Sequence, residues 1–180
     1  MIILTSLAMA AGEAGYDKGF TVKSDSGDFL LRINGQEQFR FTATEGDGAF
    51  TEANFQMARV RLKFSGQAWN EDVRYNIQFD LGKGAPSLKD AALELRGPAI
   101  LTVGQFKKPY SRQELTPDSK LTFVDLAPTA KEFGTGRDIG FMVSGKSDEG
   151  LYGAVGVFNG TGEKPATTGT ADLTTGAEIG

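Results

Sequence analysis

The sequence predicts an all-β fold, specifically an antiparallel up-and-down transmembrane β-barrel. Three observations predict it. Apolar residues recur with a period of two rather than the period of a helix, the oily faces of successive strands fall into register, and the connections alternate between long and short. The mean hydropathy is -0.25 and no apolar run is long enough for a spanning helix, so a helical membrane protein is excluded.

The first predicted strand runs from Asp28 to Thr42 and has one apolar and one polar face. It is longer than a typical strand of a globular protein. Glu37 is the one clear exception to the alternation. The apolar face carries Phe29, Leu31, Ile33, Phe39 and Phe41, and the polar face carries Arg32, Asn34, Gln36, Gln38 and Arg40.

The most informative segment is a hairpin predicted over Ala58 to Leu81, with a tight turn at Asn70-Glu71. Folding about this turn places polar residues opposite each other: Trp69 and Asp72, Gln67 and Arg74, Ser65 and Asn76, Lys63 and Gln78, Arg61 and Asp80. The intervening pairs are apolar or small: Ala68 and Val73, Gly66 and Tyr75, Phe64 and Ile77, Leu62 and Phe79, Val60 and Leu81. A soluble sheet also has one oily face, so this pattern leaves open whether that face meets a core or a bilayer.

The later strands are shorter, and the connections between strands alternate in length. Strands are predicted over 89–96, 100–106, 137–146 and 151–159, with an incomplete one beginning near Asp172. The long connections are 44–53, 82–87, 107–136 and 160–171, and the short ones are 70–71, 97–99 and 147–150. This order is typical of an outer-membrane barrel, with brief periplasmic turns, larger external loops and a periplasmic N-terminus.

The composition excludes several classes of function. The chain has no histidine and no cysteine, so Ser-His-Asp and Cys-His catalysis and the usual zinc sites are impossible. Asp80, Asp90 and Glu94 resemble a glycosidase pair only loosely, because acidic residues on one sheet face are common. The net charge of -4 argues against nucleic-acid binding. We therefore predict no enzyme, no cofactor and no metal site.

The N-terminus, residues 1–11, joins a short apolar run to the tripeptide Ala8-Met9-Ala10. Signal peptidases cut after small-x-small sequences of this kind, although the usual positive region is missing. We interpret residues 1–11 as the remnant of a signal peptide. The alternative is a frayed, mildly apolar terminus.

Five segments of the chain carry a family resemblance: GFTVKS at 19–24, GDF at 27–29, RVRLKFSG at 59–66, LKDA at 88–91 and, above all, LTVGQFKKPYS at 101–111. In this order and spacing they resemble the phosphate-selective porin O and P family of Gram-negative outer membranes. The resemblance runs from about Gly19 to the C-terminus.

The resemblance implies a homotrimer of sixteen-stranded barrels that passes small anions such as phosphate through the outer membrane of a Gram-negative cell. Its partners would be outer-membrane lipid and the permeating anions. Since about eight strands are predicted, we expect residues 12–180 to form the N-terminal half of such a barrel. The connection 107–136 falls where the family has a loop that folds inward and narrows the lumen.

If the oily face meets lipid, a set of cations points into the lumen, where unpaired cations attract anions. The predicted pore-lining residues are Arg32, Arg40, Arg59, Arg61, Lys63 and Arg74, and those of the constriction loop are Lys107, Lys108 and Arg112. Alternatively, some of these cations only brace the wall, for example by pairing Arg61 with Asp80.

A second function remains open on these residues. A soluble or membrane-anchored β-barrel could turn the oily face inward and bind a small apolar ligand there. In that protein the side chains of Arg59, Arg61 and Lys63 would lie on the outer surface.

Overall fold

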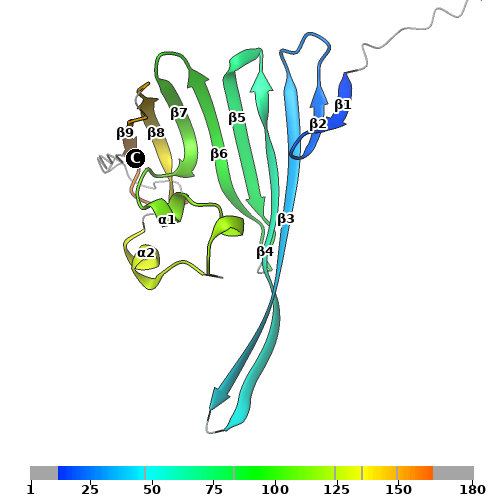
Figure 1. Ribbon diagram of the computed structural model, residues 1–180, viewed down its shortest axis with the longest axis vertical. Coiled ribbons are helices and arrows are strands. Elements are labelled where there is room, and N and C mark those ends of the chain that lie inside the picture. The colour runs from blue at the N-terminus through cyan, green and yellow to red at the C-terminus, as the bar shows by residue number, and fades with distance from the viewer. Residues whose placement is uncertain are drawn as a thin grey trace, which may run out of the picture.

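The computed structural model describes residues 12–46, 48–82, 84–123, 125–134, 136–148 and 150–163. These residues form one nine-stranded antiparallel sheet in which every strand pairs with the next along the chain (Figure 1). This is the architecture of an incomplete up-and-down barrel, and it confirms the predicted fold class. The strands are β1 (Glu13–Tyr16), β2 (Phe20–Lys23), β3 (Leu30–Gly46), β4 (Ala49–Ala68), β5 (Asn70–Asp80), β6 (Ser87–Arg96), β7 (Ile100–Lys107), β8 (Arg137–Lys146) and β9 (Tyr152–Phe158).

Two of these nine strands, β1 and β2, were not predicted, and the other seven correspond to predicted strands. Each of β1 and β2 has only four residues, too few to show a period in the sequence. The turn between them uses Lys18 at φ 52°, and Phe20 then pairs with Ile33 of β3. The strand expected near Asp172 lies outside the described residues, as does the segment 1–11 interpreted as a signal remnant.

The prediction of a long connection over 44–53 is wrong, because β3 and β4 continue to pair as far as Gly46 and Ala49. Figure 1 shows the resulting hairpin projecting beyond the neighbouring strands. Cross-strand aromatic contacts accompany the extra pairing: the Phe55 ring lies 5.5 Å from that of Phe39 and 4.7 Å from that of Phe41. Such pairs stabilise a hairpin. They favour strand pairing here although the polar composition of 44–53 is typical of a loop.

The register of the β4–β5 hairpin is as predicted along most of its length, but its turn is shifted. The pairs from Arg61 with Asp80 to Gln67 with Arg74 are all present. At the tip, Ala68 pairs with Asn70, and Trp69 makes the reversal at φ 67°. The Asn70 side chain accepts hydrogen bonds from two following backbone N–H groups at 3.0 and 3.1 Å, which stabilises this tighter turn.

The sheet has an apolar face, which carries Val60, Leu62, Phe64, Ile77 and Phe79, and a polar face, which carries the predicted pore-lining cations. None of those five apolar side chains is buried. Farther along the same face, Phe141 is 49% exposed and Val155 is 60% exposed. No layer of the described chain covers the apolar face, so it is not the inner surface of a closed core.

The connections between strands lie at the two ends of the sheet's strands. At one end of the strands lie the β2–β3, β4–β5, β6–β7 and β8–β9 turns, and we call this the Trp69 end after the residue in the β4–β5 turn (Figure 1). At the opposite end lie the β1–β2 turn, the tip of the β3–β4 hairpin, and the β5–β6 and β7–β8 connections. Glu13 at the start of β1 pairs with Lys23, which precedes the β2–β3 turn, so Glu13 lies at the Trp69 end. Among the described residues there is no helix long and apolar enough to cross a bilayer.

A small core lies on the polar face of β7 to β9. It consists of Phe106, Met142, Ala154 and Phe158. The Phe158 ring fits where two glycines leave room, because a Cβ on Gly140 or Gly156 would lie 2.8 or 2.7 Å from a ring carbon. This core supports the start of the β7–β8 connection, residues 108–136, which contains α1 (Arg112–Leu115), the 3-10 turn η1 (Asp118–Lys120) and α2 (Pro128–Phe133).

Candidate functional site

The half of the polar face nearer the Trp69 end forms a basic depression of about 430 Å³. Strands β3 to β6 supply its wall, because every second residue of each strand points to this face. Four of its lining residues are cationic and one is acidic: Arg32, Lys63, Arg74, Arg96 and Glu94. The lining also includes the neutral hydrogen-bonding residues Ser65, Gln67, Tyr75 and Asn76, together with Leu30 and Gly66.

Two of the four cations in the basic depression are already compensated by acids. Arg32 pairs with Asp17 at 2.9 Å, and Arg96 pairs with Glu94 at 3.0 Å. Arg74 donates from Nε to a backbone carbonyl at 3.2 Å, and within the described chain neither Arg74 nor Lys63 has an acidic partner. The basic depression therefore carries net positive charge at Lys63 and Arg74.

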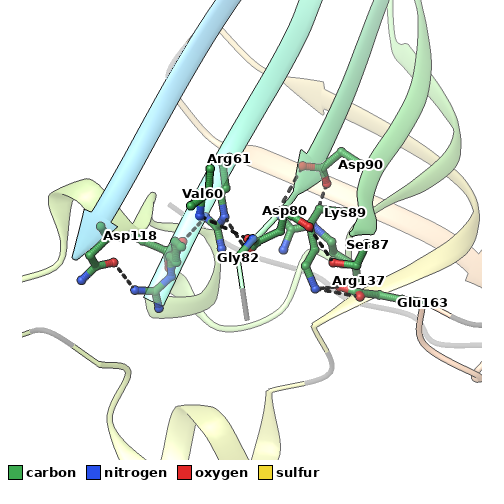
Figure 2. A network of polar contacts seen from close by, with 12 residues as sticks. Val60, Arg61, Asp80, Gly82, Ser87, Lys89, Asp90, Asp118, Arg137 and Glu163 are labelled. Carbon is green, nitrogen blue, oxygen red and sulfur yellow. Dashed lines mark hydrogen bonds and ion pairs between the residues drawn. The ribbon is translucent and has the colours of Figure 1, made fainter. Parts of the chain in front are cut away.

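Near the opposite end of the strands, three groups of ion pairs form what we call the charged belt, most of which Figure 2 labels. The charged belt consists of Arg59, Arg61, Asp80, Lys89, Asp90, Asp118, Arg137 and Glu163. Arg61 lies between Asp80, at 3.5 Å, and Asp118, which it contacts directly. Arg59 reaches the same Asp118 carboxylate at 3.4 Å. Because Asp118 comes from the β7–β8 connection, that connection lies against the polar face.

The rest of the charged belt is also matched in sign. Arg137 on β8 binds Asp90 on β6 through two hydrogen bonds of 2.8 and 3.1 Å. Lys89 binds both carboxylate oxygens of Glu163, at 3.1 and 2.9 Å. Just beyond the belt, Arg40 of the projecting hairpin pairs with Asp125 at 2.8 Å. At this level of the sheet, carboxylates thus compensate the arginines.

The three predicted cations of the loop have different surroundings. The ammonium group of Lys107 donates to the backbone carbonyl of Glu114. Lys108 is buried and pairs with Asp138 at 3.1 Å. Arg112, at the start of α1, is exposed.

Sequence reasoning placed the cations of β3 to β5 on one face, and the structure brings Arg32, Lys63 and Arg74 together there. It anticipated Asp80 as a partner of Arg61 but missed Asp17 and Asp118, which compensate Arg32, Arg59 and Arg61. Asp118 gave no signal, because it lies in an irregular segment whose fold has no period. Arg96 could have been found, since it follows Glu94 by two residues and therefore shares its face.

Comparison with known proteins agrees with this geometry. The family model described as phosphate-selective porin O and P matches residues 31–176. No curated protein matches the chain. The match spans most of the sequence and accords with an all-β sheet that has one apolar and one charged face. The chain therefore belongs to the phosphate-selective porin O and P family, a family of outer-membrane channels rather than enzymes.

Proposed function

We propose that this chain forms part of the wall of a water-filled pore through which small anions, such as phosphate, diffuse passively across the outer membrane of a Gram-negative cell. The apolar face contacts lipid and the polar face lines the lumen. Family membership supports the channel and its membrane. The homotrimer expected from the resemblance is part of the same proposal.

The observation that carries the proposal is the net positive charge of the basic depression. Lys63 and Arg74 have no acidic partner in the described chain, and they line a hollow whose other groups are mostly polar. Cations in a narrow aqueous space with low-dielectric walls raise the local concentration of anions. A planar guanidinium binds two oxygens of phosphate at once, while water in the hollow keeps the binding weak enough for release.

We propose that the β7–β8 connection narrows the lumen at the level of the charged belt. Its contacts with Arg59, Arg61 and Arg40 support this placement. These arginines then serve mainly to hold the connection, because each already has a carboxylate partner. Of the three predicted loop cations, Arg112 is the one exposed to a passing anion.

The alternative of a barrel that binds an apolar ligand inside requires an enclosed apolar face. The exposed side chains of Ile77, Phe141 and Val155 do not form such an enclosure in the described chain. We therefore prefer the channel to the ligand-binding barrel.

A planar-bilayer recording of the full-length porin tests this function. Under a salt gradient, the reversal potential should show preference for chloride over potassium, and phosphate should reduce the chloride current. The Lys63→Gln, Arg74→Gln double variant should lose a large part of that preference. The control is Lys18→Asn in the exposed β1–β2 turn, since asparagine tolerates the positive φ. Cation preference of the unmodified channel would contradict the proposal.

A further inference from the structure

Asp138, the second residue of β8, has a fully buried carboxylate, with 0% of the side chain exposed. Its partner Lys108 is 8% exposed, and the Nζ–Oδ2 distance is 3.1 Å. Two charges taken out of water in this way remain stable only when further hydrogen bonds satisfy them. No other ion pair of the described residues is buried to this degree.

The further hydrogen bonds of Asp138 come from two different parts of the chain. The backbone N–H of Ile139 donates to Oδ1 at 2.8 Å, within β8 itself. The backbone N–H of Gly160 donates to Oδ2 at 3.0 Å. Lys108 begins the β7–β8 connection, and Gly160 is the second residue of the segment that follows β9. One carboxylate thus holds the start of both connections.

The surroundings make this contact rigid. The Lys108 ammonium lies 5.9 Å from the centroid of the Phe158 ring, a cation–π contact. Phe158 in turn packs against Phe106 at 5.4 Å and is 1% exposed. The backbone N–H of Lys108 also donates to the carbonyl of Gly136 at 3.2 Å, which closes the base of the β7–β8 connection.

Both connections held by Asp138 continue into the charged belt. The β7–β8 connection reaches Arg59 and Arg61 through Asp118, and the segment after β9 reaches Lys89 through Glu163. The Lys89–Glu163 pair is partly exposed, and such pairs contribute little on their own. Removal of one partner from a buried pair is far more disruptive, because it leaves an uncompensated charge.

We propose that Asp138 is a positioning residue of the pore. It fixes the bases of the 108–136 connection and of the 159–163 segment relative to each other, and thereby sets the width of the lumen at the charged belt. Asp138 touches no permeating ion in this account; it acts through Lys108 and Gly160. The inference rests on the proposed channel function.

Single-channel recording of an Asp138→Asn variant of the full-length porin tests the proposal. We expect the barrel to fold, as judged by its heat-modifiable mobility on a gel, but open-channel noise and the spread of conductance to rise severalfold. Proteolysis within 108–136 should become faster by a similar factor. The control is Asp148→Asn in the exposed turn at the other end of β8, which should leave both readouts unchanged.

A double variant, Lys108→Met with Asp138→Asn, carries the test if the single variant does not assemble. It removes both buried charges, so it leaves none unpaired, yet it still lacks the contact that joins the two connections. Quiet channels and unaltered proteolysis in the variant that assembles would overturn the proposal. Failure of the channel function is a separate result, because it would appear in the unmodified protein as absent conductance or cation preference.

Discussion

The carboxylate of Asp118, in the β7–β8 connection, contacts the guanidinium of Arg61 on β4, 57 residues earlier in the chain. The same carboxylate lies 3.4 Å from Nε of Arg59, and its side chain is only 13% exposed. The connection therefore supplies its own anion to two arginines of the wall. In the proposed channel, an anion at this level would meet cations that are already compensated, whereas Lys63 and Arg74 have no acidic partner in the described chain.

Replacing Asp118 with asparagine should increase the anion preference of the channel. Arg59 would lose its carboxylate partner, and Arg61 would keep only Asp80, so the field at the charged belt becomes more positive. We expect the chloride-to-potassium permeability ratio to rise roughly two- to tenfold, which corresponds to ~0.4–1.4 kcal/mol. Reversal potentials under a salt gradient measure the ratio, and a fall in it would contradict this assignment of Asp118.

Gly66 on β4 should not tolerate alanine. A Cβ at this position would lie 1.8 Å from the carbonyl oxygen of Leu30, to which the Tyr75 hydroxyl donates at 3.0 Å. We expect Gly66→Ala to lower the urea midpoint of unfolding by roughly 1 M, because the Leu30 carbonyl would have to move and its hydrogen bond from Tyr75 would be disturbed. Gly35→Ala on β3 is the matched control, since its Cβ would meet no atom closer than 4.0 Å. Equal midpoints for the two variants would show that the close approach is absent.

Glu37 is the exception to the alternation of β3, and the register places it beside apolar residues. It pairs with Val60, is exposed, and has no ion pair within the described chain. A carboxylate on a lipid-contacting surface is unfavourable. Glu37→Leu should therefore raise the urea midpoint in lipid vesicles by roughly 0.5 M. Gln36→Leu, on the polar face, should not raise it. A lower midpoint for Glu37→Leu would mean that the carboxylate has a partner in the membrane.

The sequence predicted those parts of the fold where a period of two continues across a tight turn. The β4–β5 register is confirmed from the Arg61–Asp80 pair to the Gln67–Arg74 pair. The sequence did not predict β1 and β2, which are too short to show a period, or the extension of the β3–β4 hairpin. There, the aromatic contacts of Phe55 favour pairing in a segment whose polar residues resemble those of a loop.

The polar face was predictable for the same reason, but the pairing of its charges was less so. The Arg61–Asp80 contact follows from the register and is present at 3.5 Å. The partner of Arg59 lies in a connection with no regular period, and the burial of Lys108 depends on the small core beneath Phe158. Contacts that depend on irregular backbone or on packing between distant strands leave no pattern in a single sequence.

In the proposed channel the apolar face meets lipid and the polar face meets water, and two adjacent residues of β4 distinguish the two surroundings. The chain has no cysteine, so Leu62→Cys and Lys63→Cys each introduce a single thiol at nearly the same depth. In native outer-membrane vesicles, a charged, membrane-impermeant thiol reagent should modify the Lys63→Cys variant and spare the Leu62→Cys variant. A spin label on the Leu62→Cys variant should collide with oxygen dissolved in lipid. A label there that is shielded from both oxygen and aqueous quenchers would contradict the account.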